Sequence, residues 1–203
     1  MTITGMLTLA LGLCLSLLLF VRGLRTVLIL LTVVLLGTVG LIAQSLPAGI
    51  EPGPATLLLA MDLATVVTAM GILVVAGFKD HRAGARPPRR LTDSLVASAV
   101  LLVILSFTLW GNAPMRVVDF AWMLLLVSGH VLMIRAYGLL DVGVGLMVLL
   151  FGIKLLHIVL IVPLGIAELG VLNITVIIAA MIVAYAGDVL LIQSDGDGNH
   201  RTS

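Results

Sequence analysis

The stretch LLFGIKLLHIVLIV, residues 149–162, places a lysine and a histidine inside an apolar run. Lys154 and His157 are three residues apart, so on a helix their side chains share one face. An ionisable side chain inside a membrane costs at least ~2.5–3.5 kcal/mol on insertion scales. A mid-helix lysine cannot easily extend its ammonium group to the membrane surface. Lys154 therefore needs a carboxylate partner or water, or it must be neutral.

Other ionisable residues also interrupt apolar segments or stand at their ends. With Lys154 and His157, the candidates for ion translocation are Asp62, His130, Asp141 and Glu168. Intramembrane ionisable residues usually face protein or a water-filled cavity and often mark ion pathways. Two histidines in separate segments, without a cysteine or paired carboxylates, make a poor metal site. The sequence contains no nucleophile–base pair or cofactor motif, so we expect no catalytic site, metal or cofactor in this chain.

The composition indicates an integral membrane protein. The chain is 61% hydrophobic and 10% charged, with a mean hydropathy of +1.28, whereas soluble domains average about 45–50% apolar and about 25% charged residues. Apolar runs of ~18 residues or more recur, each long enough to cross about 30 Å of hydrocarbon. We expect a multi-pass protein of the inner (plasma) membrane, in contact with lipid and not with nucleic acid. The single cysteine, Cys14, excludes an intrachain disulfide.

The elements that must position the candidate residues are seven membrane-spanning helices, because a lone strand in lipid would leave its backbone groups unsatisfied. The predicted fold is therefore an all-α polytopic bundle, a single domain over 1–192, followed by a disordered tail over 193–203. The first span lacks the features of a cleaved signal peptide. The expected spans are 3–21, 26–45, 55–78, 93–110, 117–134, 138–161 and 167–192.

Basic residues between the spans predict the orientation. The first, third and fifth loops carry eight lysines and arginines, and the second, fourth and sixth carry only Arg116. This asymmetry places the N-terminus outside and the C-terminus in the cytoplasm. The basic loop 79–90 either binds lipid headgroups or a cytoplasmic subunit, or it only fixes this topology.

With this orientation, four candidates form a ladder along the sixth span. Asp141 lies near the cytoplasmic side, and Lys154 follows thirteen residues later, about 20 Å along a helix. His157 lies one turn further, and Glu168 lies near the outer surface. Asp141 and Lys154 are offset by roughly 140° around the axis, so water or groups from other helices would have to link them.

Simpler interpretations remain for several of these residues. Glu168, like Asp119 and Asp188, lies near a span end and equally suits the membrane interface. His130 is equally explained as a neutral histidine that is hydrogen-bonded to another helix. Asp62 is equally explained as a protonated group that forms a hydrogen bond between helices. The glycines around Asp141 permit close helix packing.

Two segments resemble a known family. The stretch RAYGLLDVGVGLMVLL at 135–150 and the stretch PLGIAELGVLNITVIIAAMIV at 163–183 are similar to the E-type membrane component of hydrogenase-4. This family is related to the small K-type membrane component of respiratory complex I and to Mrp-type antiporter complexes. In the family, an arginine precedes an intramembrane carboxylate, as Arg135 precedes Asp141 here, and an acidic segment opens the last helix, as Glu168 does.

The resemblance implies a subunit of a proton- or sodium-coupled complex, beside antiporter-like membrane subunits. It implies that Asp141 takes the place of the family's intramembrane glutamate in a lateral charge-transfer path. Val142 stands where the family has asparagine. The family tends to carry a lysine in the third span, where this chain has Asp62. Either Lys154 and His157 would form a relocated path, or the subunit would have become structural.

Three functions fit the sequence. The first is a non-catalytic subunit of an energy-coupling complex, with intramembrane charges that take part in proton or sodium translocation. The second is a scaffold subunit whose charges only pair helices. The third is a free-standing small transporter, although the spans show no inverted repeat of the kind that many transporters contain.

Overall fold

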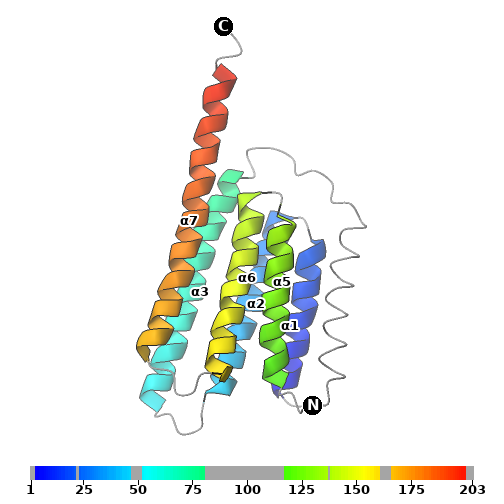
Figure 1. The fold of residues 1–203 in the computed structure, drawn as a ribbon, viewed down its shortest axis with the longest axis vertical. Coiled ribbons are helices and arrows are strands. Elements are labelled where there is room, and N and C mark those ends of the chain that lie inside the picture. Colours follow the sequence, from blue (N-terminus) through cyan, green and yellow to red (C-terminus); the bar gives the residue numbers. More distant parts are fainter. Residues whose placement is uncertain are drawn as a thin grey trace.

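The computed structural model describes residues 3–21, 23–46, 52–80, 117–136, 138–160 and 166–199, and these form a bundle of six α-helices (Figure 1). Five helices are long and apolar enough to cross a membrane, and α5 is a shorter apolar helix. The predicted all-helical class is confirmed for these residues, whereas the expected span 93–110 lies outside them. The helices are α1 (Ile3–Phe20), α2 (Leu24–Ser45), α3 (Pro52–Asp80), α5 (Val117–Ile134), α6 (Leu139–Leu160) and α7 (Ile166–Asn199).

Local sequence explains where several helices begin and end. Gly23 caps the start of α2 in an extended conformation. At the other end of α2, the N–H of Leu46 still bonds to the carbonyl of Ile42, and Pro47 follows in the sequence, where it disfavours further helix. Pro52 is the first residue of α3, a position where a missing N–H costs nothing.

Helix α7 is longer than its apolar sequence suggests. The predicted span ends at 192, with a disordered tail over 193–203, but the helix continues to Asn199 and extends beyond the other helices in Figure 1. Hydropathy marks where a helix leaves the membrane and not where it ends, because its i→i−4 hydrogen bonds also form in water.

The bundle has one central helix. Helix α6 packs against α2, α3, α5 and α7, and many of its side chains are buried. The N-terminus and the end of α7 lie at opposite ends of the bundle (Figure 1). We call these the N-terminal end and the C-terminal end of the bundle. Helices α1, α3 and α7 each expose large apolar side chains along one face.

Helices α5 and α6 approach each other backbone to backbone. A Cβ atom on Gly129 would lie 2.7 Å from the backbone nitrogen of Leu149, and one on Gly145 would lie 2.8 Å from that of Met133. Only a hydrogen atom fits at these positions. Lipid tails are as apolar as leucine, so helices associate in a membrane mainly through such close packing. Gly145 is one of the glycines for which the sequence predicts this role.

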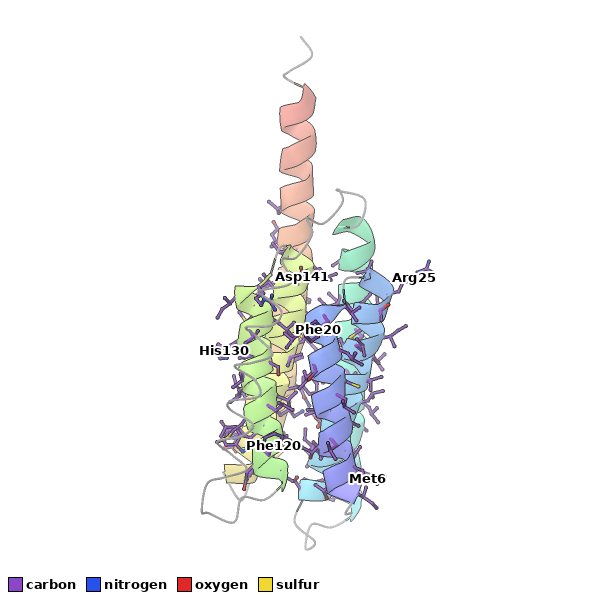
Figure 2. The ribbon with its side chains drawn as sticks, turned by 90° about the vertical axis from the view of Figure 1, so that its right-hand side faces the viewer. Met6, Phe20, Arg25, Phe120, His130 and Asp141 are labelled. Carbon is purple, nitrogen blue, oxygen red and sulfur yellow. The ribbon has the colours of Figure 1, made fainter. Side chains whose placement is uncertain are left out.

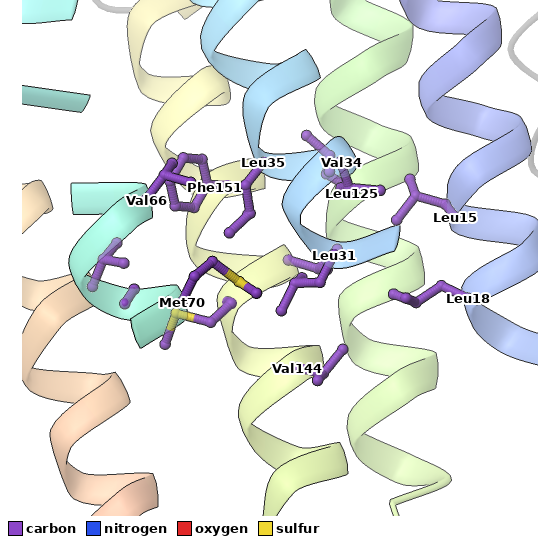
Figure 3. Close-up of a cluster of buried hydrophobic side chains, with 14 of the residues drawn as sticks. Leu15, Leu18, Leu31, Val34, Leu35, Val66, Met70, Leu125, Val144 and Phe151 are labelled. Atoms are coloured by element: carbon purple, nitrogen blue, oxygen red, sulfur yellow. The ribbon is translucent and has the colours of Figure 1, made fainter. Parts of the chain in front are cut away.

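Buried apolar side chains from all six described helices form one core cluster. Figure 3 shows part of this core, including Phe151 of α6 and Val66 of α3. The labelled core residues are Leu15, Leu18, Leu31, Val34, Leu35, Val66, Met70, Leu125, Val144 and Phe151.

Two buried threonine hydroxyls inside the helices are satisfied locally. The buried hydroxyls of Thr38 and Thr65 each donate 2.8 Å hydrogen bonds to the carbonyl four residues earlier, of Val34 and Met61. This pattern lets a threonine enter an apolar helix without a partner on another helix. Hydroxyl groups therefore do not account for the polar contacts between helices in the core.

Candidate functional site

Lys154 is fully buried on the central helix, with 0% of its surface exposed. Its ammonium group donates a hydrogen bond to Oδ1 of Asp62 on α3, and the two side chains form an ion pair. Asp62 is itself only 3% exposed. Of the three alternatives expected for Lys154, the structure shows a carboxylate partner, and it is ninety-two positions away in the sequence.

Asn173 of α7 completes the site. Lys154 Nζ donates to Oδ1 of Asn173 at 2.5 Å, and Nδ2 of Asn173 donates to Oδ1 of Asp62 at 2.9 Å. Asn173 is 4% exposed. The three side chains thus form a closed hydrogen-bonded triangle, which we call the Lys154 cluster. The cluster joins α3, α6 and α7.

The cluster lies at one depth in the bundle. Asp62, Lys154 and Asn173 are three to five residues from the middle of their apolar segments, Gly53–Gly77, Leu139–Val159 and Glu168–Ala186. At 1.5 Å per residue these offsets are about 5–8 Å. Each of the three residues lies on the side of the span middle that is nearer to the N-terminal end of the bundle. The ion pair therefore lies within the apolar part of the spans and not at their ends.

Apolar residues separate the cluster from the C-terminal end of the bundle. Phe151 and Val66, one turn from Lys154 and Asp62 on that side, are almost fully buried, and both belong to the apolar core in Figure 3. The centroid of the Phe151 ring lies 5.8 Å from the Lys154 ammonium group. A cation near an aromatic face is stabilised by about 0.5–2 kcal/mol, so Phe151 both closes this side and favours the charged lysine.

The opposite side of the cluster is also closed, but by a thinner layer. Leu58, Ile158 and Leu169 lie one turn from the three cluster residues toward the N-terminal end, and each is buried. The partly exposed His157 and the exposed Glu168 lie at the same level. Among the described residues of these three helices, the ionisable side chains nearest to the cluster along the sequence therefore lie on its N-terminal side.

A lysine and an aspartate in contact can transfer a proton between them. Moving one proton from the ammonium group to the carboxylate neutralises both residues, whereas adding or removing a proton gives the pair a net charge. In a low-dielectric interior such a net charge is costly, so a change in protonation favours rearrangement of the helices or entry of water. Asn173 can follow either state, because its amide both donates and accepts hydrogen bonds.

The other predicted site residues lie apart from the cluster. Asp141 is half-buried in the first turn of α6, near the C-terminal end of the bundle, and has an interaction of its own. His130 of α5 is exposed, and its Nδ1 donates a 2.9 Å hydrogen bond to the carbonyl of Leu126. Figure 2 shows both residues toward that end.

The predicted ladder along α6 differs from the observed contacts. Among the described residues, the side-chain partners of Lys154 come from α3 and α7, and not from Asp141, His157 or Glu168. The reason is geometric: facing helices bring side chains within bonding distance, whereas groups along one helix are separated by its rise. The simpler interpretation of Asp62 is a protonated interhelical group; Asp62 does bond to other helices, but in an ion pair with Lys154.

Asn173 is absent from the sequence-based candidates. Those candidates are all ionisable residues, and asparagine carries no charge. The signal available was an amide in the otherwise apolar run of α7. Buried polar side chains need hydrogen-bond partners, so this amide predicts a polar group on a neighbouring helix, but it does not say which one.

Replacing Asn173 tests the triangle. Asn173→Leu removes one acceptor from Lys154 and one donor from Asp62, and we expect a loss of about 1–3 kcal/mol in the free energy of unfolding. Thr175→Val on the same helix is the control, because Thr175 is exposed and its hydroxyl bonds only to the carbonyl of Val171. Thermal unfolding in a mild detergent measures both. Equal stabilities of the two variants would show that Asn173 contributes little.

Among the described residues, no group of three or more histidine, cysteine, aspartate or glutamate side chains is arranged to hold a metal ion. The Lys154 cluster itself contains one carboxylate and one amide beside a cation, which is a poor donor set for a metal. No protein-family model, curated protein or solved structure matches this chain. The clues to function therefore come from the geometry of the cluster and from the chain's own sequence.

Proposed function

We propose that this chain is an integral membrane subunit of a multisubunit energy-coupling complex, and that its Lys154 cluster takes part in proton or sodium translocation. One observation carries the proposal: a lysine–aspartate ion pair, bonded to an asparagine, is buried within the apolar part of three spans. Such pairs are costly to keep in a membrane and commonly mark ion or proton paths.

We further propose that the chain crosses the plasma membrane seven times, with the N-terminus outside. The excess of lysine and arginine in the odd-numbered loops supports this orientation. The opposite positions of the two chain ends in the bundle are consistent with an odd number of crossings (Figure 1). The cluster would then lie in the outer half of the membrane.

The proposed partners are other membrane subunits of antiporter-like type. The resemblance of 135–150 and 163–183 to the E-type membrane component of hydrogenase-4 supports this choice. In that arrangement Asp141, near the cytoplasmic side, would contribute a separate charged group. His130, His157 and Glu168 are further candidates for this path, since each is at least partly exposed.

A scaffold role is the second candidate, and a specific observation favours it. Within the part of the chain that the structure describes, the polar contacts of the cluster are all internal, and buried apolar residues flank it on both sides. A cluster of this kind can specify which helices pack together without moving ions. A free-standing transporter is the remaining alternative.

Two measurements separate these functions. The first is purification of the tagged protein in mild detergent with identification of the chains that co-purify. Recovery with antiporter-like subunits is expected, and recovery only as a monomer or homo-oligomer would contradict the complex.

The second measurement is ion flux by the purified assembly in proteoliposomes. The triple variant Asp62→Leu/Lys154→Met/Asn173→Leu replaces the cluster by apolar side chains of similar size and leaves no buried polar group unpaired. If the cluster takes part in translocation, the variant assembles but loses flux. If the cluster is only a scaffold, the variant keeps both. Thr175→Val is the control for substitution on α7.

A further inference from the structure

The helices around the cluster form two closely packed pairs. Helices α5 and α6 touch backbone to backbone at Gly129 and Gly145, and a Cβ atom on Gly152 would lie 3.0 Å from the backbone nitrogen of Leu126. Helices α3 and α7 lie side by side along the bundle (Figure 1) and make extensive contact. By contrast, α3 and α6 contact each other sparsely. We call the boundary between the two pairs the seam.

Helix α6 also packs against α7 across the seam, and two contacts on one face of α6 cross the seam at different depths. Gly143 is one of them: a Cβ atom there would lie 2.7 Å from Cγ1 of Val183 on α7 and 3.1 Å from Cδ2 of Leu73 on α3. Lys154 is the other. Lys154 follows Gly143 by eleven residues. On a helix the two residues are therefore rotated by only about 20° from each other around the axis and separated by about 16 Å along it. The two contacts therefore face the same helix pair at different depths.

These two contacts differ in kind. The contact at Gly143 is apolar and depends on close packing, which does not change with charge. The contact at Lys154 is ionic and hydrogen-bonded, and it changes when either charge is lost. On the C-terminal side of the cluster Phe151 and Val66 are buried, and the longer part of each span lies on that side, whereas only one turn of buried apolar residues covers the cluster on the other side. Opening is therefore less obstructed at the N-terminal end.

From this arrangement we infer that the Lys154 cluster is an ionic latch across the seam. When the ion pair is lost, the α3–α7 pair tilts away from α6 at the N-terminal end of the bundle, with the Gly143 contact as the fulcrum. The tilt admits water to Lys154 from that end only. The inference rests on the proposed function for its biological use, since an ion path needs such an entrance, but its test measures neither ions nor partners.

Cysteine accessibility tests the latch directly. In a Cys14→Ser background, which removes the only native cysteine, a single cysteine is introduced by Ile158→Cys or by Leu140→Cys. These positions are eighteen residues apart, or five full turns, so they face the same direction at opposite ends of α6. Both side chains are buried, at 5% and 2% exposure. The protein is placed in lipid nanodiscs, where a polar maleimide reaches both ends.

The latch is opened by Asp62→Asn/Lys154→Gln, which removes both charges and keeps hydrogen-bonding groups. We expect the rate of labelling at position 158 to rise about tenfold or more, as for the loss of hydrogen bonds to a charged group. The rate at position 140 should change less than about twofold. Asn173→Leu, which keeps the ion pair but removes the bond to α7, provides a second and milder variant with a smaller rise at position 158.

A disulfide at the fulcrum distinguishes tilting from general loosening. The substitutions Gly143→Cys and Val183→Cys introduce the two cysteines. A Cβ atom on residue 143 would lie 3.5 Å from Cβ of residue 183, which is within the range found in disulfides. We expect this disulfide to form and to leave the increased labelling at position 158 unchanged in the double variant.

Other outcomes would overturn the inference. An unchanged rate at position 158 in both latch variants would show that the cluster does not hold the seam closed. An equal rise at positions 140 and 158 would indicate loosening of the whole bundle. Failure of the disulfide to form, or suppression of the labelling by the disulfide, would exclude Gly143 as the fulcrum.

Discussion

Lys154→Met is expected to lower the free energy of unfolding by about 3–5 kcal/mol, the usual cost of removing one partner from a buried ion pair. The methionine side chain has a similar length, so the apolar contacts of α6 are largely kept. Asp62 would remain buried at 3% exposure without its cation. Thermal or denaturant-induced unfolding in mild detergent measures the loss.

The apolar triple variant provides the control for this result. Asp62→Leu/Lys154→Met/Asn173→Leu removes the uncompensated carboxylate and amide together, and replacing buried ion pairs by packed apolar groups is often neutral or stabilising. We expect the triple variant to regain most of the stability that Lys154→Met loses. A triple variant as unstable as the single variant would show that shape, and not charge pairing, dominates at this site.

Gly145→Ala is expected to lower the free energy of unfolding by about 1–3 kcal/mol, which is typical of overpacking. The added methyl group would lie 2.8 Å from the backbone nitrogen of Met133 and 2.9 Å from the carbonyl oxygen of Gly129. Backbone atoms cannot rotate away as side chains can, so α5 and α6 would have to separate. The same unfolding measurement detects the effect.

Gly71→Ala is the matched control, with the opposite expected sign. Gly71 lies inside α3, is exposed, and has no atom within 4 Å of an added Cβ. Alanine is favoured over glycine within a helix by about 1 kcal/mol, so Gly71→Ala should be neutral or stabilising. If Gly145→Ala also stabilised the protein, this result would contradict the close approach of α5 and α6.

The positions of the helices can be predicted from local sequence. Most ends of the described spans are marked by glycine, proline or charged residues, and in lipid an apolar run must form a helix to satisfy its own backbone. For this reason the predicted spans 3–21 and 117–134 agree closely with α1 and α5. The end of α7 differs because hydropathy reports the membrane boundary and not the limit of the helix.

The candidate site is only partly written in the sequence. Lys154 and Asp62 stand out one by one, because a charge in an apolar run is costly wherever it occurs. The sequence alone does not pair them: Asp141, Glu168 and Asp62 were all available carboxylates. Asn173 carries no charge, so it is recognised as part of the site only when the structure shows its partners on the neighbouring helices.

The order of the residues is enough to establish that this chain is a helical membrane protein and that Lys154 needs a compensating partner. Which partner it finds depends on the tertiary structure, because helix neighbours follow from the packing of side chains across the whole bundle. The close approach at Gly129 and Gly145 sets the position of α6, and α6 then presents Lys154 to α3 and α7. Burial costs can be estimated one residue at a time, whereas contacts between helices depend on many residues at once.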